Sequence, residues 1–291
     1  MAPVPDDDAA RREPSTGQGS DRDTGGAVLD GQGSLAPAAQ PGSLSPTAAD
    51  GIGWVTLVTT VVAAGALLVA MGSGYAAALG VTLVLALALA AGWPLLTGSR
   101  TPAATSAVLA VSAVAIVLSA VRRDLQWVPA AVAFGIVLSF LTQLGRRAGR
   151  EGLVLTLLSS FGGLVVMASG ATAVVAVDDA RGRAVAVVAM AAVAAGVAGD
   201  LFAGARALAR WLGVIALAAG MLVAVLAASR TGQVGTLEAL GIGAAAGAGS
   251  WAFRRIFSLE PAMLTARGQV AAATGSVLAV GAVVCLFSLL T

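Results

Sequence analysis

The chain has 291 residues, of which 58% are hydrophobic and 11% are charged, with a net charge of +2. Soluble domains carry about 25% charged residues, so most of this chain needs lipid around it. It contains no His and no Lys, which excludes imidazole bases, His-ligated metals or haem, and lysine Schiff bases. With Cys285 as the single cysteine, an internal disulfide and a cysteine-cluster metal site are excluded as well. We therefore expect no metal, no cofactor and no catalytic residue, and an enzyme is disfavoured.

The first segment, residues 1–50, is rich in Pro, Gly and Ser and carries eight acidic residues against three arginines. It has almost no apolar runs, so it cannot bury enough surface to offset its chain entropy. The sequence predicts a disordered acidic tail over residues 1–50 and a polytopic transmembrane helical domain over residues 51–291.

The second segment divides into apolar runs, each close to the ~20 residues that cross the hydrocarbon core of a bilayer. This pattern predicts an all-α integral membrane bundle of about nine transmembrane helices. The first break, Gly72-Ser73-Gly74, is short and uncharged, which leaves eight spans as the alternative. The expected helices cover residues 53–71, 75–95, 103–121, 127–145, 152–177, 184–204, 209–229, 235–253 and 268–290.

Arginines give the expected orientation. With nine spans, nine arginines fall in the short loops on the side of the N-terminus and five on the other side. Short cytoplasmic loops are enriched in Arg, so we expect a cytoplasmic N-terminus. The dominance of Ala, Gly, Val and Leu, which have GC-rich codons, indicates a bacterial source and therefore a bacterial plasma membrane. All five tryptophans fall near expected helix ends, where their rings prefer the membrane–water boundary.

Asp200 is the first candidate for a ligand-binding carboxylate. It lies near the inner end of the expected sixth span and within two helical turns of Arg206 and Arg210. A charge at the bilayer centre costs at least ~3 kcal/mol, but much less near a helix end. The position favours an interfacial acid that ends the helix, and the alternative is a carboxylate that faces a polar cavity between helices.

Glu238 is the second candidate, about one turn into the expected eighth span. The same span carries Gly243 and Gly247, and this spacing of small residues lets two membrane helices pack at backbone contact. A glutamate next to such a face could hydrogen-bond across the helix pair. The alternative is an acid at the outer interface beside ordinary close packing.

Arg146, Arg147 and Arg150 form a basic cluster in one expected inner loop. Such a cluster can bind anionic lipid headgroups, and the alternative is that it only sets the topology. Nucleic acid is not expected as a partner, because the cluster is short, lies at the membrane and has no interleaved aromatic residues.

The stretch SFLTQLGRRAGREGLVLTLLSSFGGLVVMASGA, residues 139–171, resembles a group of multi-pass membrane proteins encoded in actinobacterial genomes. In that group an aromatic-Gln-Leu-Arg-Arg junction precedes a glycine-rich helix. The resemblance extends over roughly the last two thirds of the chain. It implies a membrane location and an actinobacterial source, and it implies no site residue.

Three functional hypotheses follow from these patterns. The first is a permease-like carrier or lipid-handling protein for a neutral or amphiphilic solute. The second is a non-catalytic accessory or scaffold of cell-envelope machinery, with a membrane-protein partner or a second copy of itself. The third is an integral membrane enzyme that acts on a lipid-linked substrate. The even spacing of the spans favours the first, and the glycine packing faces favour the second.

Overall fold

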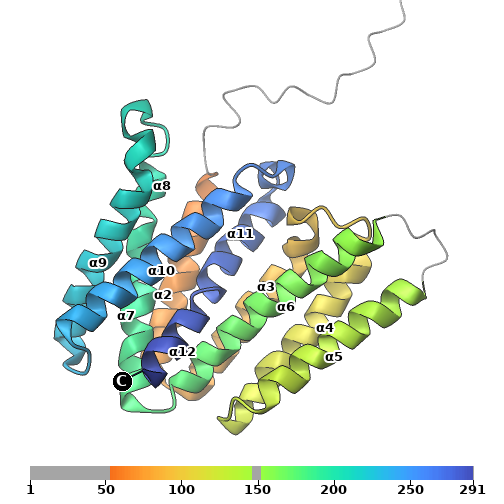
Figure 1. Cartoon of the computed structure of the whole chain (residues 1–291), viewed down its shortest axis with the longest axis horizontal. Helices are drawn as coiled ribbons and strands as arrows, with labels where there is room; N and C mark the ends of the chain where they lie inside the picture. The colour runs from red at the N-terminus through yellow and green to blue at the C-terminus, as the bar shows by residue number, and fades with distance from the viewer. Residues whose placement is uncertain (1–52, 146–151, 291) are drawn as a thin grey trace, which may run out of the picture. The chain divides into compact units, whose positions relative to one another are not determined.

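The computed structural model describes residues 53–145 and 152–290, and in these ranges the regular secondary structure is all helical, with no strand. Eight of its helical segments are long and apolar enough to cross a membrane. The protein is therefore a multi-pass membrane protein (Figure 1). The eight segments are α2 (Trp54–Ser73), α3 (Tyr75–Leu96), α4 (Pro102–Ser119) with its 3₁₀ extension η1 (Ala120–Arg122), α5 (Trp127–Leu144), α6 (Leu153–Ala176), α7 (Ala180–Gly196) with α8 (Ala198–Leu201), α9 (Leu212–Thr231), and α11 (Ala266–Leu278) with α12 (Gly281–Leu289).

A ninth long helix, α10 (Thr236–Phe257), packs among these eight, chiefly against α9 and α7. Its composition is less apolar, since it begins with Glu238 in its first turn and ends with Arg254 and Arg255 in its last. The described residues thus form nine long helical segments, the predicted number, of which eight are apolar enough to be membrane spans. The break after α2 is real, because Gly74 adopts φ 138°, a value that side-chain-bearing residues rarely adopt. The tail predicted for residues 1–50 lies outside the described residues.

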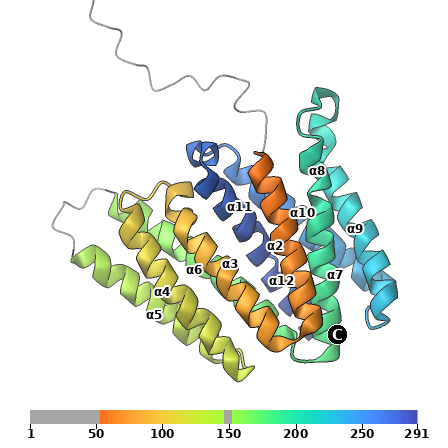
Figure 2. The ribbon, with the colours of Figure 1, turned by 180° about the vertical axis from the view of Figure 1, so that it is seen from behind.

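The helices run alternately between two faces of the bundle (Figures 1 and 2). We call the face where α2 begins the first face and the face where α2 ends the second face. On the second face, the Tyr75 hydroxyl donates to the Ala120 carbonyl, and Arg123 forms an ion pair with Asp178 at 2.8 Å. The first bond joins the start of α3 to η1, and the second joins the loop after η1 to the loop after α6.

Close helix packing depends on glycines and alanines. The α9–α10–α7 contact is one example, because a Cβ added at Gly243 would lie 2.7 Å from the Gly220 carbonyl oxygen of α9. A Cβ at Gly247 would lie 3.0 Å from Gly220 Cα and 3.4 Å from the Ala192 carbonyl oxygen of α7. The predicted packing residues Gly243 and Gly247 thus lie where three helices of this chain meet. Backbone contact of this kind compensates for the absence of a hydrophobic driving force within lipid.

The last span is interrupted at Ala279 and Val280, between α11 and α12. The side chain of Ser169, on α6, bridges the interruption: its hydroxyl donates to the Ala279 carbonyl at 2.9 Å and accepts from the Ala282 N–H at 2.7 Å. Backbone groups freed by a helix break in lipid need such partners. Gly281 allows the close approach, since a Cβ there would lie 1.9 Å from the Ser169 carbonyl oxygen.

Ser169→Ala should therefore destabilise the folded protein by about 1–2 kcal/mol, because two backbone groups at the helix break lose their partner. Ser160→Ala is the matched control on the same helix, since the Ser160 hydroxyl donates only to the Thr156 carbonyl one turn earlier. Thermal unfolding in detergent, followed by circular dichroism, measures both. Equal effects of the two substitutions would contradict a bridging role for Ser169.

Two expectations need correction. Trp93 lies near the end of α3, but it is buried in the core rather than placed at an interface, and its indole N–H donates to the Ser159 carbonyl at 2.8 Å. The expected sixth span began at residue 184 and ended at 204, whereas α7 begins at Ala180 and the segment ends at Leu201. The reason is a cap: the Asp179 carboxylate accepts from the Gly182 N–H at 2.6 Å and starts the helix one turn earlier.

Candidate functional site

The site is an ion pair buried between helices near the first face. Asp200 lies on α8, a single turn that follows a break in the helix at Val197, and Arg254 lies in the last turn of α10. Both side chains are wholly inaccessible to solvent. Arg254 Nε donates to Asp200 Oδ2 at 2.7 Å, and Arg254 Nη2 lies 2.6 Å from the same oxygen. The pair therefore ties the end of the α7–α8 span to the end of α10.

Two serines complete the surroundings of the guanidinium. Arg254 Nη1 donates to the Ser250 hydroxyl at 2.7 Å and to the Ser276 hydroxyl at 3.3 Å. Ser250 precedes Arg254 by one turn on α10, so both side chains lie on the same face of that helix. Ser276 comes from α11. Three segments that are well separated in the sequence thus supply one polar cluster.

The pairing is one-sided. Both nitrogens converge on Asp200 Oδ2, while Oδ1 is buried and accepts no hydrogen bond from any described residue. A side-on pair with two parallel bonds would have satisfied both oxygens. Leaving a buried acceptor without a partner is costly. The cluster therefore presents an acceptor oxygen that a donor group of a ligand, or a proton, could occupy.

Aromatic rings cover the adjacent side of α10. Phe253 and Phe257 lie 6.2 Å and 5.3 Å from the Trp93 ring of α3, measured between ring centroids. These rings pack α10 against α3 beside Arg254 in the chain. In an apolar environment of this kind a buried charge is retained only when it is paired, so Asp200 and Arg254 depend on each other.

The structure changes the expected surroundings of Asp200. The sequence favoured an interfacial acid near Arg206 and Arg210, but Asp200 is buried and its partner is Arg254, 54 positions away. The guanidinium of Arg210 lies instead over the Trp211 ring, 5.8 Å from the centroid. Arg254, Ser250 and Ser276 were not singled out from the sequence. The sequence offered one signal for Arg254: it follows the apolar, glycine-rich run of Gly243 and Gly247 with no Pro or Gly directly before it, which indicates that the helix continues through it.

Glu238, the second candidate, lies near the second face in the first turn of α10. Both of its carboxylate oxygens accept from Arg181 Nη2 at 3.0 Å. The Glu238 side chain is 14% exposed and the Arg181 side chain 36%. Glu238 does bond across a helix pair, from α10 to α7, but it lies far along α10 from the Asp200 cluster.

The lipid-binding residues proposed from the sequence, Arg146, Arg147 and Arg150, lie outside the described residues. Within the described ranges, no group of three His, Cys, Asp or Glu side chains could hold a metal ion. The groups of the Asp200 cluster can form hydrogen bonds and charge pairs, and the carboxylate can bind a proton.

Comparisons with protein-family models, with curated proteins and with solved structures found no match. The function must therefore be inferred from the geometry of the site and its place in the bundle.

Proposed function

We propose that this protein is a permease-like carrier of a bacterial plasma membrane, with its N-terminus in the cytoplasm, that moves a neutral or amphiphilic solute. The observation that supports this most is the buried Asp200–Arg254 pair, placed at a helix interruption and shared by three helices. Ionisable residues buried in membrane domains mark solute or proton pathways in many transport proteins. Interrupted helices, here at Val197 and between α11 and α12, are also common at their binding sites.

In this proposal the ion pair holds the helices around the site together until a solute binds. In the conformation described here the pair holds α8 against α10 and α11, and both side chains are closed off from solvent. A solute that donates a hydrogen bond to Asp200 Oδ1 would weaken the one-sided pair and allow α8 to separate from α10. The Trp93, Phe253 and Phe257 rings beside the cluster favour an amphiphilic solute over a strongly polar one.

The test is transbilayer movement of a fluorescent phospholipid in proteoliposomes that contain the full-length protein. Dithionite added outside quenches only the outer leaflet, so continued quenching reports movement of lipid across the bilayer. We expect activity with the wild-type chain and its loss in the double variant Asp200→Asn with Arg254→Gln, which removes both charges and leaves no unpaired charge in the interior. Glu238→Gln is the control at the other face and should retain activity. Wild-type vesicles that behave like empty ones would reject a lipid-handling carrier.

The accessory hypothesis is the second candidate, and α5 is the observation that favours it. This helix packs chiefly against α4 and α6, and it is the least buried of the eight apolar spans. It exposes Phe134, Phe140 and Leu144. Native mass spectrometry of the protein extracted from its host in mild detergent distinguishes the two hypotheses. A stoichiometric second protein that is lost on Leu144→Ser would favour the accessory role.

A further inference from the structure

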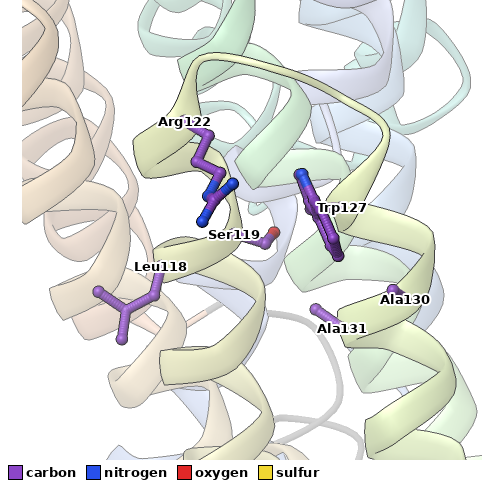
Figure 3. A pocket seen from close by; sticks show the side chains of 6 residues that line it. All are labelled: Leu118, Ser119, Arg122, Trp127, Ala130 and Ala131. Atoms are coloured by element: carbon purple, nitrogen blue, oxygen red, sulfur yellow. The ribbon is translucent and has the colours of Figure 1, made fainter.

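A groove near the second face lies between the end of α4 and the start of α5 (Figure 3). Its volume is about 330 Å³, and its lining is apolar apart from one serine and one arginine. This volume is within the range of small-molecule sites in proteins, roughly 300–1,000 Å³. The lining residues are Leu118, Ser119, Arg122, Trp127, Ala130 and Ala131.

An arginine and a tryptophan flank the groove on the side of the second face. The Arg122 guanidinium lies over the Trp127 ring, 5.5 Å from its centroid, and Figure 3 shows both side chains turned toward the groove. Trp127 is the first residue of α5 and is 46% exposed. An amphipathic ring at a helix start of this kind marks the boundary between hydrocarbon and headgroups.

The charge of Arg122 is not matched within the described residues. Its neighbour Arg123 is paired with Asp178 and lies over the Tyr75 ring. The nearby acid, Asp124, accepts a hydrogen bond from the Gln126 N–H at 2.9 Å and forms no ion pair with Arg122. Arg122 is exposed and has only the Trp127 ring as a described partner. An anion at this position would meet one uncompensated positive charge.

The apolar surface continues from the groove toward the middle of the bundle. Val114 lies one turn before Leu118 on α4, and Phe134 lies one turn after Ala130 on α5. Residues spaced in this way share a helix face, and both side chains are exposed, Val114 by 38% and Phe134 by 49%. The groove thus continues into a track for a hydrocarbon chain that begins beside a cationic group.

We propose that this groove binds one anionic phospholipid, with its phosphate at Arg122, its glycerol region beside Trp127 and an acyl chain along the α4–α5 track. Charge complementarity selects an anionic headgroup, and the apolar track selects a chain over a free phosphate. The site is separate from the Asp200 cluster, and the proposal does not depend on the carrier function.

The experiment measures retention of lipid by the full-length protein in native mass spectrometry, with dioleoyl phosphatidylglycerol and dioleoyl phosphatidylcholine as probes. Wild-type protein should retain the anionic lipid preferentially. Arg122→Gln should weaken that retention about fivefold, the effect expected for one arginine near an anionic membrane surface. Arg230→Gln is the matched control, because Arg230 is exposed at the end of α9 near the same face and does not line the groove. It should leave retention unchanged.

Ala130→Leu is the second variant, since it keeps the charge but fills the groove, and it should weaken retention of the same lipid. The unfolding temperature of each variant in detergent is measured first, and lipid retention is compared only between folded variants. If Arg122→Gln fails to fold, Ala130→Leu decides the question. Wild-type retention in Ala130→Leu would overturn the proposal, as would equal losses in Arg122→Gln and Arg230→Gln. A dimer that dissociates on Arg122→Gln would also overturn it and assign the groove to a protein contact.

Discussion

Arg254→Gln should destabilise the folded protein by about 3–5 kcal/mol, which is the cost of leaving a buried charge without its partner. The substitution removes the donors to Asp200 Oδ2 and leaves a carboxylate with no solvent access between α8, α10 and α11. Loss of monodisperse protein on size-exclusion chromatography, together with a lower unfolding temperature in detergent, measures the effect.

Two comparisons separate this effect from a general loss of charge. Arg255 is the next residue on α10 but is exposed, so Arg255→Gln should change stability by less than about 0.5 kcal/mol. The double variant Asp200→Asn with Arg254→Gln removes both charges and should be more stable than Arg254→Gln alone, because no unpaired charge stays buried. A double variant as unstable as the sum of the two single variants would show that the pair is not coupled.

Gly243→Leu should destabilise the protein by at least about 3 kcal/mol, at the upper end of the usual cost of overpacking. A Cβ at this position would lie 2.7 Å from Ala224 Cβ and 2.7 Å from Met221 Cα. Backbone atoms cannot move aside as a flexible side chain can, so α9 and α10 would have to separate. The unfolding temperature in detergent, together with cross-linking between cysteines placed on α9 and α10, measures the separation.

Gly249→Leu is the matched control on the same helix. A Cβ added at Gly249 would have no neighbour within 4 Å, and leucine favours a helix over glycine by up to ~1 kcal/mol. This variant should therefore be neutral or slightly more stable than the wild type. Similar losses for Gly243→Leu and Gly249→Leu would mean that α10 does not tolerate larger side chains for a reason other than its contact with α9.

These two predictions also bear on the function. Gly243 and Gly247 contact α9 and α7 of the same chain, so their small size already serves packing within the bundle. A partner protein therefore needs a different surface, and α5 offers one. The Asp200 cluster, in contrast, ties α8 to α10 with a single charge pair and α10 to α11 with one serine hydroxyl, that of Ser276. In the proposed carrier, separation of α8 from α10 and α11 would break these polar contacts.

The sequence by itself determined the class of the protein and the course of its helices. Apolar runs separated by arginines, Pro and Gly are sufficient for this, because every backbone group in lipid must be bonded within a helix and each helix must span the same thickness. The breaks at Gly74 and before Pro102 fall where the local sequence places them. The spacing of Gly243 and Gly247 also indicated a close helix contact from local pattern alone.

Only the tertiary structure decided which polar groups meet. Asp200 has Arg206 and Arg210 nearby in the sequence, yet its partner is Arg254. Partner choice depends on how α8, α10 and α11 pack, and a single sequence carries no signal for contacts over such separations. The bridge from Ser169 to the break before Gly281 is another such contact, more than 100 positions apart. The hydrophobic pattern of the sequence indicates whether each helix is surrounded by lipid or by water. Which charges pair depends instead on how the surfaces of the helices fit together.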